Sequence, residues 1–219
     1  GTPTVNTAGV ALSVTANSAA KTYGTAFTLV GTAFTSSGLQ NGDTIGSVTL
    51  TSGGAVATAN VGSYPIVPSA ATGGTFTPSN YTITYVNGTL TVNTAALSVT
   101  ANSATKTYGQ TATFLGTAFT SIGLQNSQTI GSVTLTSTGA VATANVAGSP
   151  YAIVPSAASG GTFTPANYTI TYVNGALTVN PAALSVTANN AAKTYGQTAT
   201  FLGTAFTSIG LQNSQTIGS

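Results

Sequence analysis

The ionisable side chains of this sequence are few, and they bound the chemistry that it can perform. Its 219 residues include three lysines and one aspartate, and no histidine or cysteine. General acid–base catalysis needs a titratable group near the working pH and a second group to orient it. A hydroxyl nucleophile needs a base, and zinc or calcium sites need several His, Cys or carboxylate ligands. We therefore expect no enzyme activity, no cofactor and no metal site. The four ionisable residues are Lys21, Asp43, Lys106 and Lys193.

The overall composition indicates a folded chain with very little charge. Hydrophobic residues make up 42% of the sequence and charged residues 2%, whereas disordered segments are poor in apolar residues and rich in charge. The net charge of +2 comes from widely spaced lysines, which are too sparse to neutralise a nucleic-acid backbone. No apolar run reaches the roughly 20 residues that a transmembrane helix needs. We expect neither nucleic-acid binding nor membrane insertion in this segment.

A motif of the form Lys-Thr-Tyr-Gly occurs three times and defines a long internal repeat. Its copies are spaced by 85 and 87 residues, a period typical of a domain rather than of a solenoid turn. The motif residues are Lys21, Tyr23, Gly24, Lys106, Tyr108, Gly109, Lys193, Tyr195 and Gly196.

The repeat predicts a window on a longer tandem array. Residues 1–6, GTPTVN, match the end of the first repeat, and residues 106–132 are identical to 193–219. The predicted parts are the last strand of a preceding truncated repeat at 1–9, full repeats at 10–94 and 95–181, and the first part of a truncated third repeat at 182–219.

Strict alternation of apolar and polar residues predicts β-strands throughout one repeat. Asn87-Gly88 and Asn174-Gly175 each lie between two alternating runs, which predicts a hairpin with a two-residue turn that pairs Val86 with Thr89. The run at 96–101 predicts a strand with Leu97 and Val99 inward. Further strands are expected at 111–114, 132–136, 140–145 and 151–154, and a single helical turn at 123–128. The expected fold is all-β, with tandem antiparallel β-sandwich repeats, immunoglobulin-like or related, of about 86 residues.

The junction between repeats is short. Only Asn93-Thr94-Ala95 separates two predicted strands, and Pro181 stiffens the matching position of the next junction. Such a short linker forces neighbouring domains into contact, so we expect the array to form a rod. The recurring tyrosines and phenylalanines are expected to anchor the core or the interface, and the motif lysines to lie at the surface.

Five segments together give the chain a family resemblance. ALSVTAN, KTYG, GLQNGDTI, the Tyr-Pro-Ile-Val strand and NYTITYVNGTLTVN resemble the MBG repeat domain of large bacterial surface proteins, including filamentous-haemagglutinin-like adhesins. The resemblance implies an all-β extracellular stalk or fibre module without catalytic residues. One departure from the pattern is that Gly42-Asp43 becomes Ser127-Gln128 and Ser214-Gln215 in the later repeats, so the resemblance implies no ion or turn role for an acid there.

These observations favour a structural role, with two alternatives. The leading hypothesis is a tandem-repeat segment of an extracellular bacterial adhesin stalk, or a self-associating filament of the cell surface or biofilm matrix. Its partners would be other copies, head-to-tail or lateral, and cell-surface or matrix glycans. The first alternative is a carbohydrate-binding adhesive module that uses Asn80 and Tyr81. The second is ice binding through a face formed by Thr82, Thr84, Thr89 and Thr91.

Overall fold

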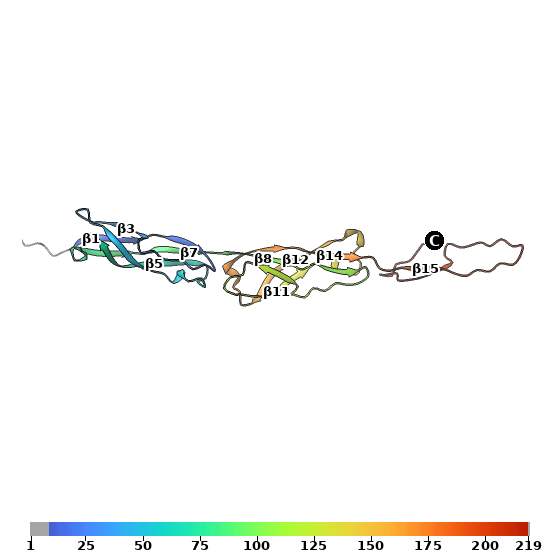
Figure 1. Cartoon of the computed structure of the whole chain (residues 1–219). Helices are drawn as coiled ribbons and strands as arrows, with labels where there is room; N and C mark the ends of the chain where they lie inside the picture. The colour runs from blue at the N-terminus through green and yellow to red at the C-terminus, as the bar shows by residue number, and fades with distance from the viewer. Residues whose placement is uncertain (1–8, 219) are drawn as a thin grey trace, which may run out of the picture. The chain divides into compact units, whose positions relative to one another are not determined.

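The computed structural model describes residues 9–218, and within them the chain is all-β with short 3-10 turns and no α-helix (Figure 1). The prediction of an all-β fold is confirmed. The strands of the first repeat are β1 (Val10–Ala16), β2 (Ala19–Thr22), β3 (Phe34–Ser37), β4 (Ile45–Thr51), β5 (Gly62–Gly74), β6 (Tyr81–Val86) and β7 (Gly88–Asn93). Those that follow are β8 (Ala95–Ala101), β9 (Ala104–Thr107), β10 (Phe119–Ile122), β11 (Ile130–Thr136), β12 (Tyr151–Gly161), β13 (Tyr168–Val173), β14 (Gly175–Asn180), β15 (Ser185–Ala188) and β16 (Phe206–Ile209).

Each full repeat contains a three-stranded and a four-stranded sheet. In the first repeat the strand orders are β3-β1-β6 and β2-β7-β5-β4, and in the second they are β10-β8-β13 and β11-β12-β14-β9. Most neighbours are antiparallel, but β1 pairs in parallel with β6, and β2 with β7. The residues after Pro181 contribute the two-stranded sheet β15-β16. The repeats are therefore sandwiches of mixed sheets.

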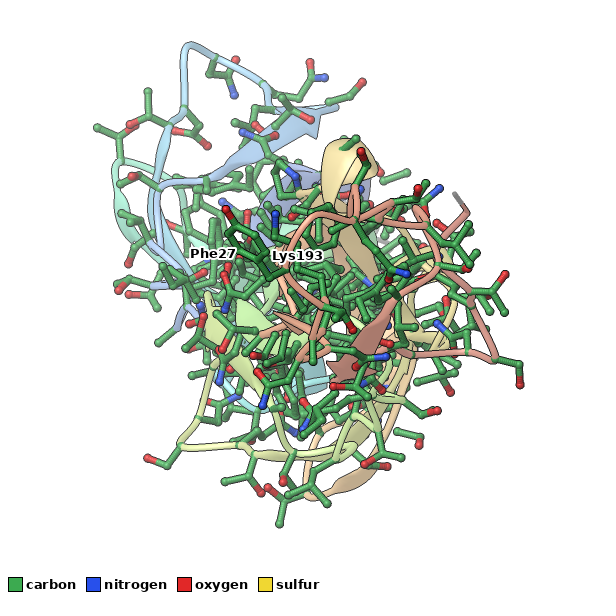
Figure 2. The ribbon with its side chains drawn as sticks, turned by 90° about the vertical axis from the view of Figure 1, so that its right-hand side faces the viewer. Phe27 and Lys193 are labelled. Carbon is green, nitrogen blue, oxygen red and sulfur yellow. The ribbon has the colours of Figure 1, made fainter. Side chains whose placement is uncertain are left out.

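The core of the first repeat lies between its two sheets. Alternate residues of β1 point inward, so Leu12 and Val14 pack with Val48 of β4 and Tyr81 of β6. A second cluster forms where Leu90 of β7 meets side chains from both sheets. Its buried members are Ala16, Ile66 and Leu90, and Phe27, labelled in Figure 2, packs against them. The apolar face of each strand is thus covered by the opposite sheet, which makes the sandwich.

The predicted Asn-Gly hairpin is wrong. The strand before Asn87 is β6, which pairs with β1, and the strand after it is β7, which pairs with β5 and β2. The chain therefore crosses from one sheet to the other at Asn87 instead of turning within a sheet. Gly88 is needed for close approach, because an added Cβ would lie 2.5 Å from the carbonyl oxygen of Ala16. At Asn174-Gly175 the same crossing connects β13 with β14.

The other predicted strands divide into two groups. The runs at 96–101, 132–136 and 151–154 lie in β8, β11 and β12, and Leu97 and Val99 are buried as expected. The runs at 111–114 and 140–145 form no strand. Ala112 and Phe114 instead pack against a core cluster from a loop, which imitates the alternation of a strand.

Two further expectations have different outcomes. The expected helical turn at 123–128 is a tight turn in which Asn126 and Ser127 have positive φ angles of 52° and 55°. The strand expected at residues 1–9 lies, except for Gly9, outside the described residues, so it stays a prediction.

The compact units of the structure do not coincide with the sequence repeats. Unit 1 extends to Leu97 and also contains Gly123–Thr129 and Thr162–Ile170. Unit 2 contains Ser98–Ile122, Ile130–Gly161 and the residues from Thr171 onward. Two segments of the second repeat therefore belong to the same compact unit as the first repeat. These two segments contact the first repeat at its Tyr-Gly motif.

Candidate functional site: the repeat junction

The motif lysine is buried, which corrects the prediction of a surface side chain. Lys21 follows the alternation of β2 into the interior and is 7% exposed. Its ammonium donates hydrogen bonds to the carbonyl oxygens of Thr25, at 2.9 Å, and of Val56. Burial lowers the pKa of Lys21. Two loop carbonyls thus replace the water that a surface ammonium would bind, and the lysine ties two loops together.

Of the other two motif lysines, Lys106 has the same role and Lys193 does not. Lys106 is 6% exposed and donates to the carbonyl oxygens of Gln110, at 3.0 Å, and of Val141, and burial lowers its pKa. Lys193, labelled in Figure 2, is exposed and lies 3.4 Å from the carbonyl oxygen of Gln197. The lysine is buried only where the loops that bind it are folded around it.

Tyr23 and Gly24 place the motif at a junction within unit 1. The Tyr23 N–H donates to the carbonyl oxygen of Asn93 at 2.8 Å, so the motif is bound to the end of β7. The Tyr23 ring is 3% exposed and meets Tyr168 edge-on, with centroids 5.5 Å apart and an interplanar angle of 79°. Such edge-to-face pairs contribute about 0.5–1.5 kcal/mol beyond burial.

Gly24 satisfies two separate demands of this turn. Its φ angle is +89°, in the left-handed region that favours glycine. An added Cβ would also lie 2.5 Å from Cγ of Gln125, because the Gln125 side chain covers the turn. The Gly24 N–H donates to the carbonyl oxygen of Ala57 at 3.1 Å. The Tyr-Gly pair is thus a buried ring followed by a turn that has no room for a side chain.

Asn167 is the most completely buried polar side chain of the junction. It ends the short 3-10 turn Pro165–Asn167 and is 2% exposed. Its Oδ1 accepts from the backbone N–H of Val61 at 2.9 Å, and its Nδ2 donates to Oδ1 of Asn60 at 2.9 Å. The amide therefore uses both of its ends on one loop. Its counterpart in the first repeat, Asn80, is exposed.

Two weaker polar contacts surround Asn167. Thr94, in the linker between β7 and β8, shares a hydroxyl–hydroxyl hydrogen bond of 2.7 Å with Thr169. Nδ2 of Asn126 donates to the carbonyl oxygen of Ala57 at 3.4 Å. The groups in these contacts are two hydroxyls, a side-chain amide and a backbone carbonyl, and none of them carries a formal charge.

A tyrosine hydroxyl organises the loop behind the junction in both full repeats. The Tyr168 hydroxyl donates to Oε1 of Gln128 at 2.6 Å and accepts from the Gln125 N–H at 2.9 Å. In the first repeat Tyr81 donates to Oδ2 of Asp43 at 2.8 Å. The only acid of the chain therefore serves as a hydrogen-bond acceptor, and a neutral glutamine performs the same task in the second repeat. Burial raises the pKa of Tyr168.

The predicted motif and linker residues meet here, whereas the predicted turn residues do not. Tyr23, Gly24, Asn93 and Thr94 lie at the junction of unit 1, while Asn87 and Gly88 lie at the sheet crossing. The motif in unit 2 is bound in the same way, since the Tyr108 N–H donates to the carbonyl oxygen of Asn180 at 2.8 Å. Pro181 directly follows that carbonyl group.

Sequence reasoning missed Asn60, Gln125 and Asn167. Asn80 and Asn167 recur in step, but one is exposed and the other buried, so repetition alone could not reveal the role of Asn167. The only signal in the sequence was the Tyr-Gly motif, because a recurring tyrosine is expected to pack against other residues.

The described residues offer no metal cluster and no membrane helix. Within residues 9–218, no group of three or more His, Cys, Asp or Glu side chains could hold a metal ion. In the same range, no helix has the length and apolar character needed to cross a bilayer.

Comparison with known proteins gives one family and no individual relative. Residues 12–91 and 97–178 each match the sequence model of the MBG domain (YGX type). No curated protein and no solved structure matches the chain. Both matches contain a Tyr-Gly motif at the positions described above, Tyr23-Gly24 and Tyr108-Gly109.

Proposed function

We propose a structural function for this chain, which belongs to the MBG domain (YGX type) family: it is a segment of an extracellular stalk or filament whose repeats are joined by stiff, uncharged junctions. The family is a repeat domain of surface proteins and a non-enzymatic domain type. A non-enzymatic domain type agrees with a sequence that has only three lysines and one aspartate as its charged residues. An adhesin stalk or a matrix filament at the bacterial surface is the specific form we propose.

The buried amide of Asn167 carries this proposal. An asparagine that is 2% exposed and bonded to both Asn60 and Val61 has one orientation, because any other would leave buried polar groups unpaired. The edge-on pair of Tyr23 and Tyr168 adds an apolar contact that is sensitive to direction. Hydrogen bonds and ring geometry depend on angle, so together they resist reorientation as well as separation. A stalk needs that property.

Glycan and ice binding receive no support from the residues suggested for them. Tyr81 is 9% exposed and its hydroxyl is bonded to Asp43, so its ring is not available to stack on a sugar. Thr82 and Thr84 lie on β6, whereas Thr89 and Thr91 lie on β7 in the other sheet. The threonines therefore do not form one flat face.

A distance measurement between two spin labels tests the stiffness of the junction. The chain has no cysteine, so Thr49→Cys and Thr134→Cys, at exposed matching positions of β4 and β11, give two unique labels. We expect a single narrow distance distribution from pulsed electron resonance. Asn167→Ala should broaden it, and the matched control Asn80→Ala should leave it unchanged. A broad distribution in the parent protein would refute a stiff junction.

A further inference from the structure

We propose that a cavity beside Val30 in the first repeat binds the Leu115 side chain of a second copy of this chain. Copies would then associate side by side through one apolar side chain and the cavity that buries it. The inference rests on the proposed filament function, for which it names a lateral contact between chains.

The cavity lies inside the first repeat, where the chain crosses from β1 to β2. It has a volume of about 120 Å³, and Phe27, labelled in Figure 2, is part of its wall. Its lining residues all come from positions 17–66, and none of them is charged. The apolar members of the lining are Phe27, Leu29, Val30, Leu50 and Ile66.

This wall favours an apolar occupant. The Ser18 hydroxyl accepts from the Thr89 N–H at 3.0 Å, so it is already paired. In the described part of the chain, no buried side-chain nitrogen or oxygen lacks a hydrogen bond that a polar ligand would supply. An apolar cavity of about 150 Å³ binds benzene, and the isobutyl group of a leucine is smaller than that ring. The cavity therefore fits a single branched apolar side chain.

Leu115 of the second repeat is such a side chain, held in solvent by an ordered turn. It is 76% exposed. The Ala118 N–H donates to the carbonyl oxygen of Leu115 at 2.9 Å, and the Val133 N–H donates to that of Gly116 at 2.8 Å. The backbone that carries Leu115 is thus ordered before binding, which lowers the entropic cost of association.

The exposure at this position belongs to the turn itself. Val30, the matching residue of the first repeat, is also exposed, at 55%, with the second repeat following it in the chain. The two repeats differ in this loop, since TAFTLV at 25–30 corresponds to QTATFL at 110–115. The valine at the cavity is replaced by the longer leucine, and Phe114 packs against the core of the second repeat. The two repeats therefore contribute different surfaces.

The charge and the placement of these surfaces suit a filament. Lys21 and Lys106 are buried, and the chain has a net charge of only +2, which opposes the approach of two copies little. The cavity and Leu115 belong to different repeats, so one contact engages different surfaces of the two copies. A heterologous contact that does not close extends into an open assembly.

Sedimentation velocity of the whole chain tests the inference. The parent should self-associate as its concentration approaches about 1 mM. Leu115→Ser should raise the dissociation constant about tenfold or more, because the side chain that the cavity buries is lost. Ile122→Ser is the matched control, since Ile122 is 78% exposed in the same repeat, and it should leave the constant unchanged.

A mixture of two variants tests the pairing of the two surfaces. Ala33 lines the cavity, so Ala33→Leu should fill it and also weaken association about tenfold. The Ala33→Leu chain keeps Leu115, and the Leu115→Ser chain keeps the cavity. Each variant alone should therefore be mainly monomeric, whereas an equal mixture should form pairs with a dissociation constant close to that of the parent.

The proposal is overturned if the parent is monomeric at about 1 mM, or if Leu115→Ser associates like the parent. It is also overturned if the mixture of variants stays monomeric, or if benzene occupies the cavity without reducing association. The spin-label distances across the junction of unit 1 are measured within single chains at high dilution. A failure of the lateral contact is therefore distinguishable from a failure of the proposed function.

Discussion

The replacement Asn167→Ala gives the sharpest test of the junction, because the chain carries its own control. Asn80 lies in the matching 3-10 turn one repeat earlier, Pro78–Asn80, where only Ser79 in place of Ala166 differs within the turn, but it is exposed. The variant Asn80→Ala should change the free energy of unfolding by less than about 0.5 kcal/mol. Any larger effect of Asn167→Ala then reports burial and contacts rather than turn propensity.

The expected magnitude follows from the two hydrogen bonds of Asn167. A net contribution of about 0.5–1.5 kcal/mol for each bond, with both partners left behind, gives a loss of about 2 kcal/mol. Val61 is half-buried and Asn60 is exposed, so water can reach part of the site and the loss should not approach the upper limit. For a chain of this size the midpoint of thermal unfolding should fall by about 4–8 °C.

A double-mutant cycle with Asn60→Ala distinguishes a direct contact from a general loss of packing. The measurement is urea unfolding followed by tyrosine fluorescence for the parent, the two single variants and the double variant. Asn60 and Asn167 share a 2.9 Å hydrogen bond, so their effects should be non-additive by about 1 kcal/mol. Additive effects, or equal effects of Asn167→Ala and Asn80→Ala, would refute the reasoning.

Three further predictions concern the turn, the buried lysines and assembly. In an unfolding titration, Gly24→Ala should destabilise the protein by about 1–3 kcal/mol. Gly196→Ala should destabilise it by less, because Gly196 also has a positive φ angle, +85°, but has nothing within 4 Å of an added Cβ. Equal losses would show that the contact of Gly24 with Gln125 does not contribute to stability. Burial lowers the pKa of Lys21, so between that lowered pKa and the ordinary value of 10.5 the unfolded state binds more protons than the folded state. The stability of the parent relative to Lys21→Met should therefore rise with pH across this interval in urea unfolding. A stability difference that does not change with pH there would contradict the burial. Any lateral association between chains should hardly change between about 0.05 and 0.5 M NaCl or on addition of a chelator, since the chain has few charges to screen. Dissociation seen by light scattering under either condition would contradict an uncharged interface.

The strands could be predicted, but not the sheets to which they belong. The alternation in β6 and β7 indicated two half-buried strands correctly, and it fitted a hairpin equally well. Binary pattern states only that one face is buried, and in a sandwich the strands of both sheets satisfy that condition. The decisive fact was the approach of Gly88 to the carbonyl oxygen of Ala16, which is a tertiary contact.

The same limit explains the errors at the site. The sequence identified the Tyr-Gly motif and the short linker, and the structure brings Tyr23 to the carbonyl oxygen of Asn93. It could not show that Lys21 is buried, because a lysine is normally exposed unless carbonyl groups replace its water, and those groups come from Thr25 and from Val56, 35 residues away along the chain. Backbone acceptors leave no trace in side-chain composition.

An uncharged junction can still be specific, because every buried polar side chain in it has a hydrogen-bond partner. Within the described residues, no buried side-chain nitrogen or oxygen lacks a hydrogen bond. The cost of misplacing Asn167 is the cost of leaving such groups unpaired, which salt does not screen. In a linear array each added repeat also adds one junction, so stability should grow with repeat number faster than the sum of isolated domains. Asn80 and Asn167 illustrate this gain. Both repeats contain the asparagine, but we expect it to stabilise the protein only at Asn167, where the loop of the neighbouring repeat binds it.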